Sequence, residues 1–251
     1  MSVEGLELFR QRFAPYSDAY VLIGGSACDL LFSEQGMDFR ATHDLDIVVL
    51  VDKPLSGFAK TLWQFINDGD YLCGWRNNPD VHYYRFTEPK SPGFPRMIEL
   101  FARHPGFPLR DEASYIVPLP VNDDISSLSA ILLDDDYYEF LKSSLSTING
   151  INVPDVAHLI PLKARAHIDL SERKDAGQHV NSTDLKKHKK DVVSLVSIVP
   201  VNVHIELSSQ MKEDMKRFVG TLRQEGAQSN QTRPGLPLQG ALDALEDIYN
   251  L

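Results

Sequence analysis

The chain has 251 residues and a formal net charge of −10, with 25 Lys and Arg residues against 35 Asp and Glu residues. Its 43% hydrophobic and 24% charged residues are ordinary for a globular protein and exclude collagen-like, low-complexity and wholly disordered chains. The acidity excludes a protein that coats nucleic acid over its whole surface, because neutralising phosphates requires clustered Lys and Arg.

The first half of the chain alternates between predicted helices and short apolar strands. Leu6, Phe9 and Phe13 recur at helical spacing, which predicts a helix over 5–13. Further helices are predicted at 27–34 and 55–67. Strands are predicted at 20–23, 45–51, 71–75, 81–86, 97–101, 115–119 and 129–133. Asn149-Gly150, between two short apolar segments, predicts a β-hairpin.

After Pro154 the pattern becomes helical. Pro154 and Pro161 are each expected to open a helix, because proline is favoured at the first helical position. Helices are predicted at 162–173, 182–199, 204–223 and 238–249, with a polar linker at 224–236. The predicted fold class is therefore α+β, with one domain over 1–153 and a helical domain over 154–251.

The expected location is the cytoplasm, with no membrane partner. No apolar run approaches the roughly 18 residues that a membrane helix needs, and the N-terminal segment lacks the pattern of a signal peptide. Cys28 and Cys73 are too few for a disulfide framework or a structural zinc site. The eight histidines show no spacing typical of zinc ligands.

The charge is distributed unevenly along the chain. Residues 1–162 carry 12 basic and 23 acidic side chains, residues 163–190 carry 8 and 4, and residues 191–251 carry 5 and 8. The segment 163–190 is thus a basic island in an acidic protein. Within it, the run Lys186–Lys190 is either a solvated helix face or a contact for nucleotide or RNA phosphates.

The segment 23–50 combines two features that point to phosphate chemistry. Gly24-Gly25-Ser26 is expected to form a turn between a strand and a helix, where glycines let the backbone approach a phosphate and the helix N-terminus favours an anion. Asp44 and Asp46 begin the next strand, and residues two apart in a strand point to the same face.

A divalent cation would remove the repulsion between these neighbouring carboxylates. Mg²⁺ prefers hard oxygen ligands and is typically held by one or two carboxylates plus substrate phosphates. Either feature alone is common, since Gly-Gly-Ser is an ordinary turn and Asp-x-Asp is often a solvated strand end. Together they favour phosphoryl or nucleotidyl transfer.

These residues resemble the nucleotidyltransferase superfamily, which has the polymerase-β-like fold. Gly24-Gly25-Ser26-Ala27, followed by Arg40-x-Thr42-x-Asp44-Leu45-Asp46, is similar to the AbiEii/AbiGii-type toxin nucleotidyltransferases of type IV toxin–antitoxin systems. The resemblance implies a mixed β-sheet with flanking helices and a metal-binding carboxylate set, followed by a helical domain. It covers residues 20–52 well and 154–196 loosely.

The resemblance also implies further site residues. Glu99, a lone acid in an apolar strand, would be the third carboxylate: it would bind two Mg²⁺ together with Asp44 and Asp46, and would act as general base on the incoming hydroxyl. The alternative for Glu99 is an edge-strand acid that faces water. Lys163 would contact the triphosphate and Asp191 would orient it or the acceptor. The alternative for Lys163 is a solvated stripe shared with His167 and Lys174.

Other candidates carry less information. Arg40 and Thr42 either hold a phosphate or order their loop. The run Asp134–Asp136 is interpreted as a solvated junction between a strand and a helix, because three consecutive acids cannot share one face. Ser26 lacks the surroundings of a hydrolase nucleophile.

The resulting hypothesis is a Mg²⁺-dependent nucleotidyltransferase that moves a nucleoside monophosphate from an NTP to an acceptor such as RNA or tRNA. Its expected partners include an RNA acceptor and an antitoxin protein. The alternatives are a small-molecule adenylyltransferase of the antibiotic-modifying kind and a catalytically inactive nucleotide-binding module.

Overall fold

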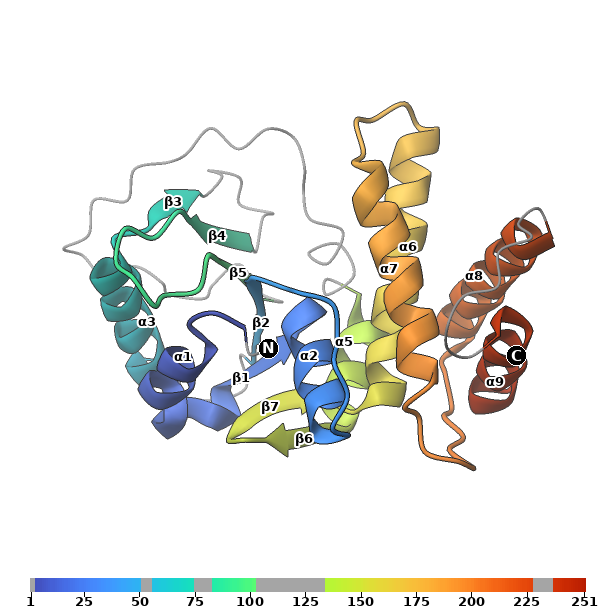
Figure 1. The fold of residues 1–251 in the computed structure, drawn as a ribbon, viewed down its shortest axis with the longest axis horizontal. Helices are drawn as coiled ribbons and strands as arrows, with labels where there is room; N and C mark the ends of the chain where they lie inside the picture. Colours follow the sequence, from blue (N-terminus) through green and yellow to red (C-terminus); the bar gives the residue numbers. More distant parts are fainter. Residues whose placement is uncertain (1–2, 51–55, 75–82, 103–133, 228–236) are drawn as a thin grey trace. The chain divides into compact units, whose positions relative to one another are not determined.

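The protein is described by a computed structural model that places residues 3–50, 56–74, 83–102, 134–227 and 237–251 (Figure 1). The strands predicted at 115–119 and 129–133 lie outside these residues. The chain divides into two compact units. Unit 1 comprises Met1–Leu132 and Leu145–Pro154, and unit 2 comprises Leu133–Ser144 and Asp155–Leu251.

Unit 1 contains a five-stranded mixed sheet with the order β1-β2-β5-β4-β3 (Figure 1). Its strands are β1 (Tyr20–Ile23), β2 (Asp44–Val49), β5 (Met97–Ala102), β4 (Tyr83–Thr87) and β3 (Leu72–Gly74). The central pair β2 and β5 is parallel, and the other neighbouring pairs are antiparallel. The predicted α+β class with a mixed sheet is confirmed.

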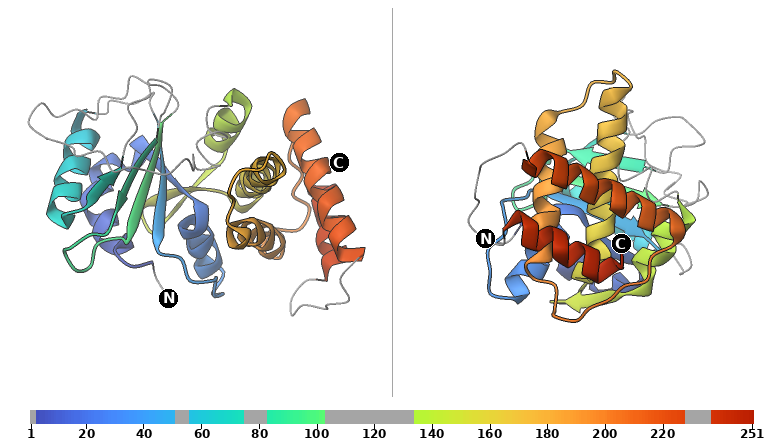
Figure 2. Two further views of the ribbon diagram at one scale, coloured as in Figure 1. Left: turned by 90° about the horizontal axis from the view of Figure 1, so that it is seen from above. Right: turned by 90° about the vertical axis from the view of Figure 1, so that its right-hand side faces the viewer.

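Helices cover both faces of this sheet. Figure 2 shows α1 (Leu6–Phe13) and α3 (Ser56–Gly69) on one side and α2 (Gly24–Glu34) on the other. A short 3₁₀ helix, η1 (Ala14–Ala19), follows α1. An aromatic core fills the space between α1, α3 and β1, with ring centroids 4.2 to 6.2 Å apart. Its members are Phe9, Phe13, Tyr20, Phe58 and Phe65. This face of the sheet is therefore filled by core packing, and the opposite face carries the polar residues of β2 and β5.

The predicted hairpin is confirmed as β6 (Leu145–Ile148) and β7 (Ile151–Pro154). Asn149 and Gly150 have φ values of 50° and 79°, the left-handed pair that a tight two-residue hairpin requires. The side chain of Asn152 donates a hydrogen bond of 2.7 Å to the carbonyl of Ser17. The hairpin is thereby tied to the start of the sheet domain.

Unit 2 is helical, as predicted. It contains α5 (Asp135–Ser143), α6 (Val156–Asp175), α7 (Ser182–Val196), α8 (Ser209–Ala227) and α9 (Leu238–Tyr249). Helices α6 and α7 pack side by side (Figure 1). Within the described ranges, no helix is both long enough and apolar enough to cross a membrane.

The prediction that Pro161 opens a helix is wrong. Helix α6 begins at Val156, where the carboxylate of Asp155 accepts a hydrogen bond from the backbone N–H of His158, and Pro161 lies inside it. A proline has no N–H to bond the carbonyl four residues earlier, which here belongs to Ala157. The hydroxyl of Tyr249 in α9 donates to that carbonyl at 2.6 Å. A tertiary contact thus replaces the hydrogen bond that the proline removes.

The predicted start of the helix over 204–223 is also wrong, since α8 begins at Ser209 and not at residue 204. The start of α5 agrees with the interpretation of Asp134–Asp136 as a helix junction. The carboxylate of Asp134 caps the helix by accepting from the backbone N–H groups of Asp136 and Tyr137.

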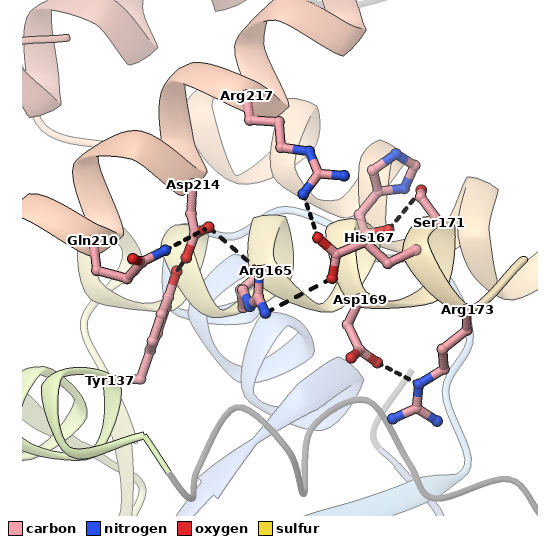
Figure 3. A network of polar contacts seen from close by, with 10 residues as sticks. Tyr137, Arg165, His167, Asp169, Ser171, Arg173, Gln210, Asp214 and Arg217 are labelled. Atoms are coloured by element: carbon pink, nitrogen blue, oxygen red, sulfur yellow. Dashed lines mark hydrogen bonds and ion pairs between the residues drawn. The ribbon is translucent and has the colours of Figure 1, made fainter. Parts of the chain in front are cut away.

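A partly buried polar network links three helices of unit 2 (Figure 3). The hydroxyl of Tyr137 in α5 donates to Asp214 in α8 at 2.9 Å, and Arg165 in α6 donates to the same carboxylate at 3.3 Å. Burial is the largest cause that raises the pKa of Tyr137, followed by the charge of Asp214. Arg217 extends the network by pairing with Glu172 of α6. Because each buried charge has a partner, this network is structural.

Candidate functional site

The first turn of α2 is shaped around two glycines. Gly24 has a φ of +69°, a left-handed conformation, and it is the first residue of α2. A Cβ atom at Gly24 would lie 1.6 Å from Oδ2 of Asp46, so the position requires glycine for both conformation and space. The helix therefore starts three residues earlier than the predicted Ala27, and Gly24-Gly25-Ser26 forms its first turn.

The loop before β2 lies against the same turn. A Cβ atom at Gly25 would be 2.5 Å from Oγ1 of Thr42 and 3.4 Å from a guanidinium nitrogen of Arg40. The hydroxyl of Ser26 donates a hydrogen bond to the backbone carbonyl of Asp44. The N-cap residue of α2, Ile23, makes no side-chain capping bond. The structure thus brings together all five residues that were predicted to bind nucleotide in unit 1.

The predicted carboxylates share one face of the sheet. Asp44 and Asp46 are two apart in β2, and Asp46 is the register partner of Glu99 on the adjacent strand β5. Asp46 is 8% exposed and Glu99 is 6% exposed, whereas Asp44 is half-buried. Glu99 lies in a central strand, so the alternative of an edge-strand acid that faces water is wrong.

Arg85 is a site residue that the sequence analysis missed. It is the register partner of Glu99 on β4, and its Nε and one Nη atom lie 2.8 and 2.7 Å from Oε1 of Glu99. The predicted strand at 81–86 contained this single Arg, and the strand at 97–101 contained the single Glu. These two residues of opposite charge could have indicated an ion pair, but only if β4 and β5 had been known to be neighbouring strands.

The donor atoms of the site suit a hard cation, although a complete cluster is not formed. Within the described part of the chain, no group of three or more His, Cys, Asp and Glu side chains is arranged to hold a metal ion. Asp44 and Asp46 supply two carboxylates on one face, which is the set that Mg²⁺ uses together with substrate phosphates. Glu99, the third predicted ligand, is engaged by Arg85 through Oε1.

The two remaining predicted residues form a buried ion pair in unit 2. Nζ of Lys163 in α6 lies 3.0 Å from Oδ2 of Asp191 in α7, and the two residues are 2% and 1% exposed. His167, one turn after Lys163, is 5% exposed and contacts the carbonyl of Leu185 at 3.0 Å. The alternative of a solvated stripe is therefore wrong for Lys163 and His167, and holds for the exposed Lys174.

His188 lies beside this pair. Burial, and then the positive charge of Lys163, lower its pKa to about 3, so its imidazole is neutral at pH 7. Its Nδ1 atom finds no hydrogen-bond partner among the described residues. Burial also lowers the pKa of His167. Two neutral imidazoles therefore lie near the pair.

Part of the basic run Lys186–Lys190 of α7 forms an ion pair within unit 2. Lys189 pairs with Glu225 of α8, whereas Lys186 and Lys190 are exposed. The exposed members form a solvated face of the helix. A contact of that face with RNA stays a prediction.

No protein-family model matches this chain, and none of the curated proteins matches it. Among solved structures, the chain is similar to the crystal structure of an antigenic nucleotidyltransferase-like protein from Paracoccidioides brasiliensis. The two are 17% identical, with 97% of this chain and 94% of that chain covered and a TM-score of 0.46. At that identity and score, the likeness assigns no activity to this chain.

Proposed function

We propose that this protein is a Mg²⁺-dependent nucleotidyltransferase of the toxin-like AbiEii type, which moves a nucleoside monophosphate from an NTP to an acceptor hydroxyl. The supporting observation is the contact between Gly24 and Asp46. It holds the carboxylate of Asp46, one of the predicted aspartate pair, directly at the N-terminus of α2. A helix N-terminus attracts phosphate, and carboxylates beside it need a cation.

Different residues of the chain have different roles in the proposed reaction. The first-turn N–H groups of α2 bind the triphosphate, together with Arg40 and Thr42, because these groups surround Gly25. Ser26 keeps α2 and β2 in register through its bond to the carbonyl of Asp44. Asp44 and Asp46 would hold the metal. When bound, Mg²⁺ supplies neutralising charge at the α-phosphate and the departing pyrophosphate.

The transfer itself is balanced. The acceptor oxygen forms a bond to the α-phosphorus, the bond from that phosphorus to the bridging oxygen breaks, and pyrophosphate leaves. Glu99, the third carboxylate on the same face, accepts the proton of the acceptor hydroxyl. The roles implied for Lys163 and Asp191 by the family resemblance stay predictions.

The acceptor is proposed to be RNA. The exposed lysines of α7, Lys186 and Lys190, are the observation that favours it, because clustered positive charge attracts a phosphate backbone. A small-molecule acceptor would not need them. An antitoxin protein as partner follows from the family resemblance alone.

Transfer of label from each α-³²P-labelled NTP, with Mg²⁺ and either total RNA or a panel of aminoglycosides, tests this function. We expect label in RNA, lost with Asp44→Asn or Asp46→Asn and kept with Asp243→Asn, an exposed acid on α9. Label in the aminoglycosides would mean that the acceptor is a small molecule and not RNA. No Asp46-dependent label in any acceptor would contradict the proposed activity.

A further inference from the structure

One register row crosses the whole sheet of unit 1 and contains three charged residues. Reading from β1 to β3, the partners are Ile23, Asp46, Glu99, Arg85 and Gly74. Neighbouring strands are about 4.8 Å apart, so these three residues lie on successive strands at about that backbone spacing, with charges in the order minus, minus, plus. The row begins at the residue that precedes the first turn of α2.

The sign of the third charge matters because the first two repel each other. Asp46 and Glu99 are both nearly buried and occupy adjacent strands, where like charges directly opposite each other destabilise the sheet. Arg85 compensates one of them, since two of its nitrogens lie within 2.8 Å of a single oxygen of Glu99. At 28% exposure, the Arg85 side chain reaches solvent while it holds that oxygen.

We propose that Arg85 is a positioning residue that competes with a divalent cation for Glu99. This inference rests on the proposed function. In the metal-free protein, Arg85 neutralises Glu99 and keeps its oxygen away from the neighbouring aspartates. When the cation is bound by Asp44 and Asp46, Glu99 exchanges the guanidinium for it. The competition stabilises the fold without metal and weakens metal affinity.

The competition explains why the three predicted ligands share a face and yet form no metal-holding group in the described part of the chain. A purely structural Arg85–Glu99 pair would behave differently. It would leave metal affinity unchanged when Arg85 is replaced, and it would make Glu99 irrelevant to metal binding. The two roles therefore differ in a binding measurement that does not involve catalysis.

Calorimetric titration of the full chain with Mn²⁺ alone tests the proposal. Arg85→Met is expected to bind Mn²⁺ about tenfold more tightly than the wild type, corresponding to about 1.4 kcal/mol. Glu99→Gln is expected to bind about tenfold more weakly. The double variant should match Glu99→Gln, because Arg85 acts only through Glu99. Arg223→Met, which breaks an exposed pair with Glu246, is the control and should match the wild type.

Thermal unfolding in EDTA and in Mn²⁺ provides the second readout. In EDTA, Arg85→Met should unfold at a lower temperature than the wild type. Mn²⁺ should raise the unfolding temperature of Arg85→Met by more than it raises that of the wild type. If Arg85→Met fails to fold, Arg85→Lys is the second variant. It keeps the positive charge but cannot contact Glu99 through two nitrogens of a guanidinium, so its Mn²⁺ affinity should rise by a smaller factor. Unchanged or weaker Mn²⁺ binding in these Arg85 variants overturns the proposal, as does wild-type binding by Glu99→Gln.

Labelled-NTP transfer, measured in parallel, separates this proposal from the proposed function. If Arg85→Met binds Mn²⁺ more tightly but the wild type transfers no label, the competition is supported and the transferase is refuted. Asp46-dependent label transfer with unchanged Mn²⁺ binding by Arg85→Met refutes the competition and keeps the transferase.

Discussion

The two units bury charge in different ways. In unit 1, Asp44, Asp46 and Glu99 share one face of the sheet, and Glu99 pairs with Arg85 on the next strand. In unit 2, Lys163 and Asp191 form a one-to-one pair that is almost completely buried. A balanced buried pair satisfies itself and holds two helices in place. The carboxylates of unit 1 instead gather on one face of the sheet, which is where we propose that a cation binds.

The largest effect is expected when the balance in unit 2 is broken. Lys163→Met leaves the carboxylate of Asp191 buried without its ammonium, which should lower the free energy of unfolding by about 3–5 kcal/mol. The double variant Lys163→Met/Asp191→Leu should recover most of that loss. Urea unfolding measures both, with the exposed Lys216→Met as a control within about 0.5 kcal/mol of wild type. A double variant as unstable as the single one would contradict a self-sufficient pair.

A smaller effect is expected at Gly24, where unit 1 brings backbone and carboxylate together. Gly24→Ala combines a left-handed φ with a clash against Asp46, and should cost about 2–3 kcal/mol. Gly36, just beyond the other end of α2, has the same φ of +69° with nothing within 4 Å. Gly36→Ala should therefore cost only about 1 kcal/mol. If urea unfolding gives Gly24→Ala and Gly36→Ala the same loss in free energy of unfolding, Asp46 does not crowd Gly24.

The smallest effect is a pH dependence of unit 2. The pKa of His188 is lowered to about 3 in the fold, whereas an unfolded chain titrates it near 6.5. Between these values the unfolded state binds more protons, so stability falls as pH falls below about 6.5, by up to about 1.4 kcal/mol per pH unit. His188→Gln should flatten this slope in urea unfolding at pH 7 and pH 5. An unchanged slope would mean that His188 does not titrate in this way.

Local patterns were enough to predict much of the site. The two-residue period of a strand placed Asp44 and Asp46 on one face, and Asn149-Gly150 marked its hairpin. Arg85 could not be assigned as the partner of Glu99, because that depends on which strands become neighbours. The family resemblance indicated Lys163 and Asp191 separately, and only the packing of α6 on α7 shows that they touch.

Pro161 shows the same limit in a helix. Proline is favoured at the first helical position because it has no N–H to donate, and that preference led to Pro161 being predicted as a helix start. Here the carbonyl that it leaves unpaired is bonded by Tyr249, which lies 92 residues beyond that carbonyl in the chain. A contact over that separation is invisible to any pattern within the helix, so the continuous α6 could not be predicted.

The central claim is that Asp44 and Asp46 bind nucleotide phosphates through a divalent cation. Calorimetric titration of a non-hydrolysable NTP analogue into the full chain, with Mg²⁺ or with EDTA, tests it most directly. We predict that Mg²⁺ tightens binding at least about tenfold in the wild type and in Asp243→Asn, and that Asp46→Asn abolishes this gain. Equal Mg²⁺-dependent binding by Asp46→Asn and the wild type would contradict the claim.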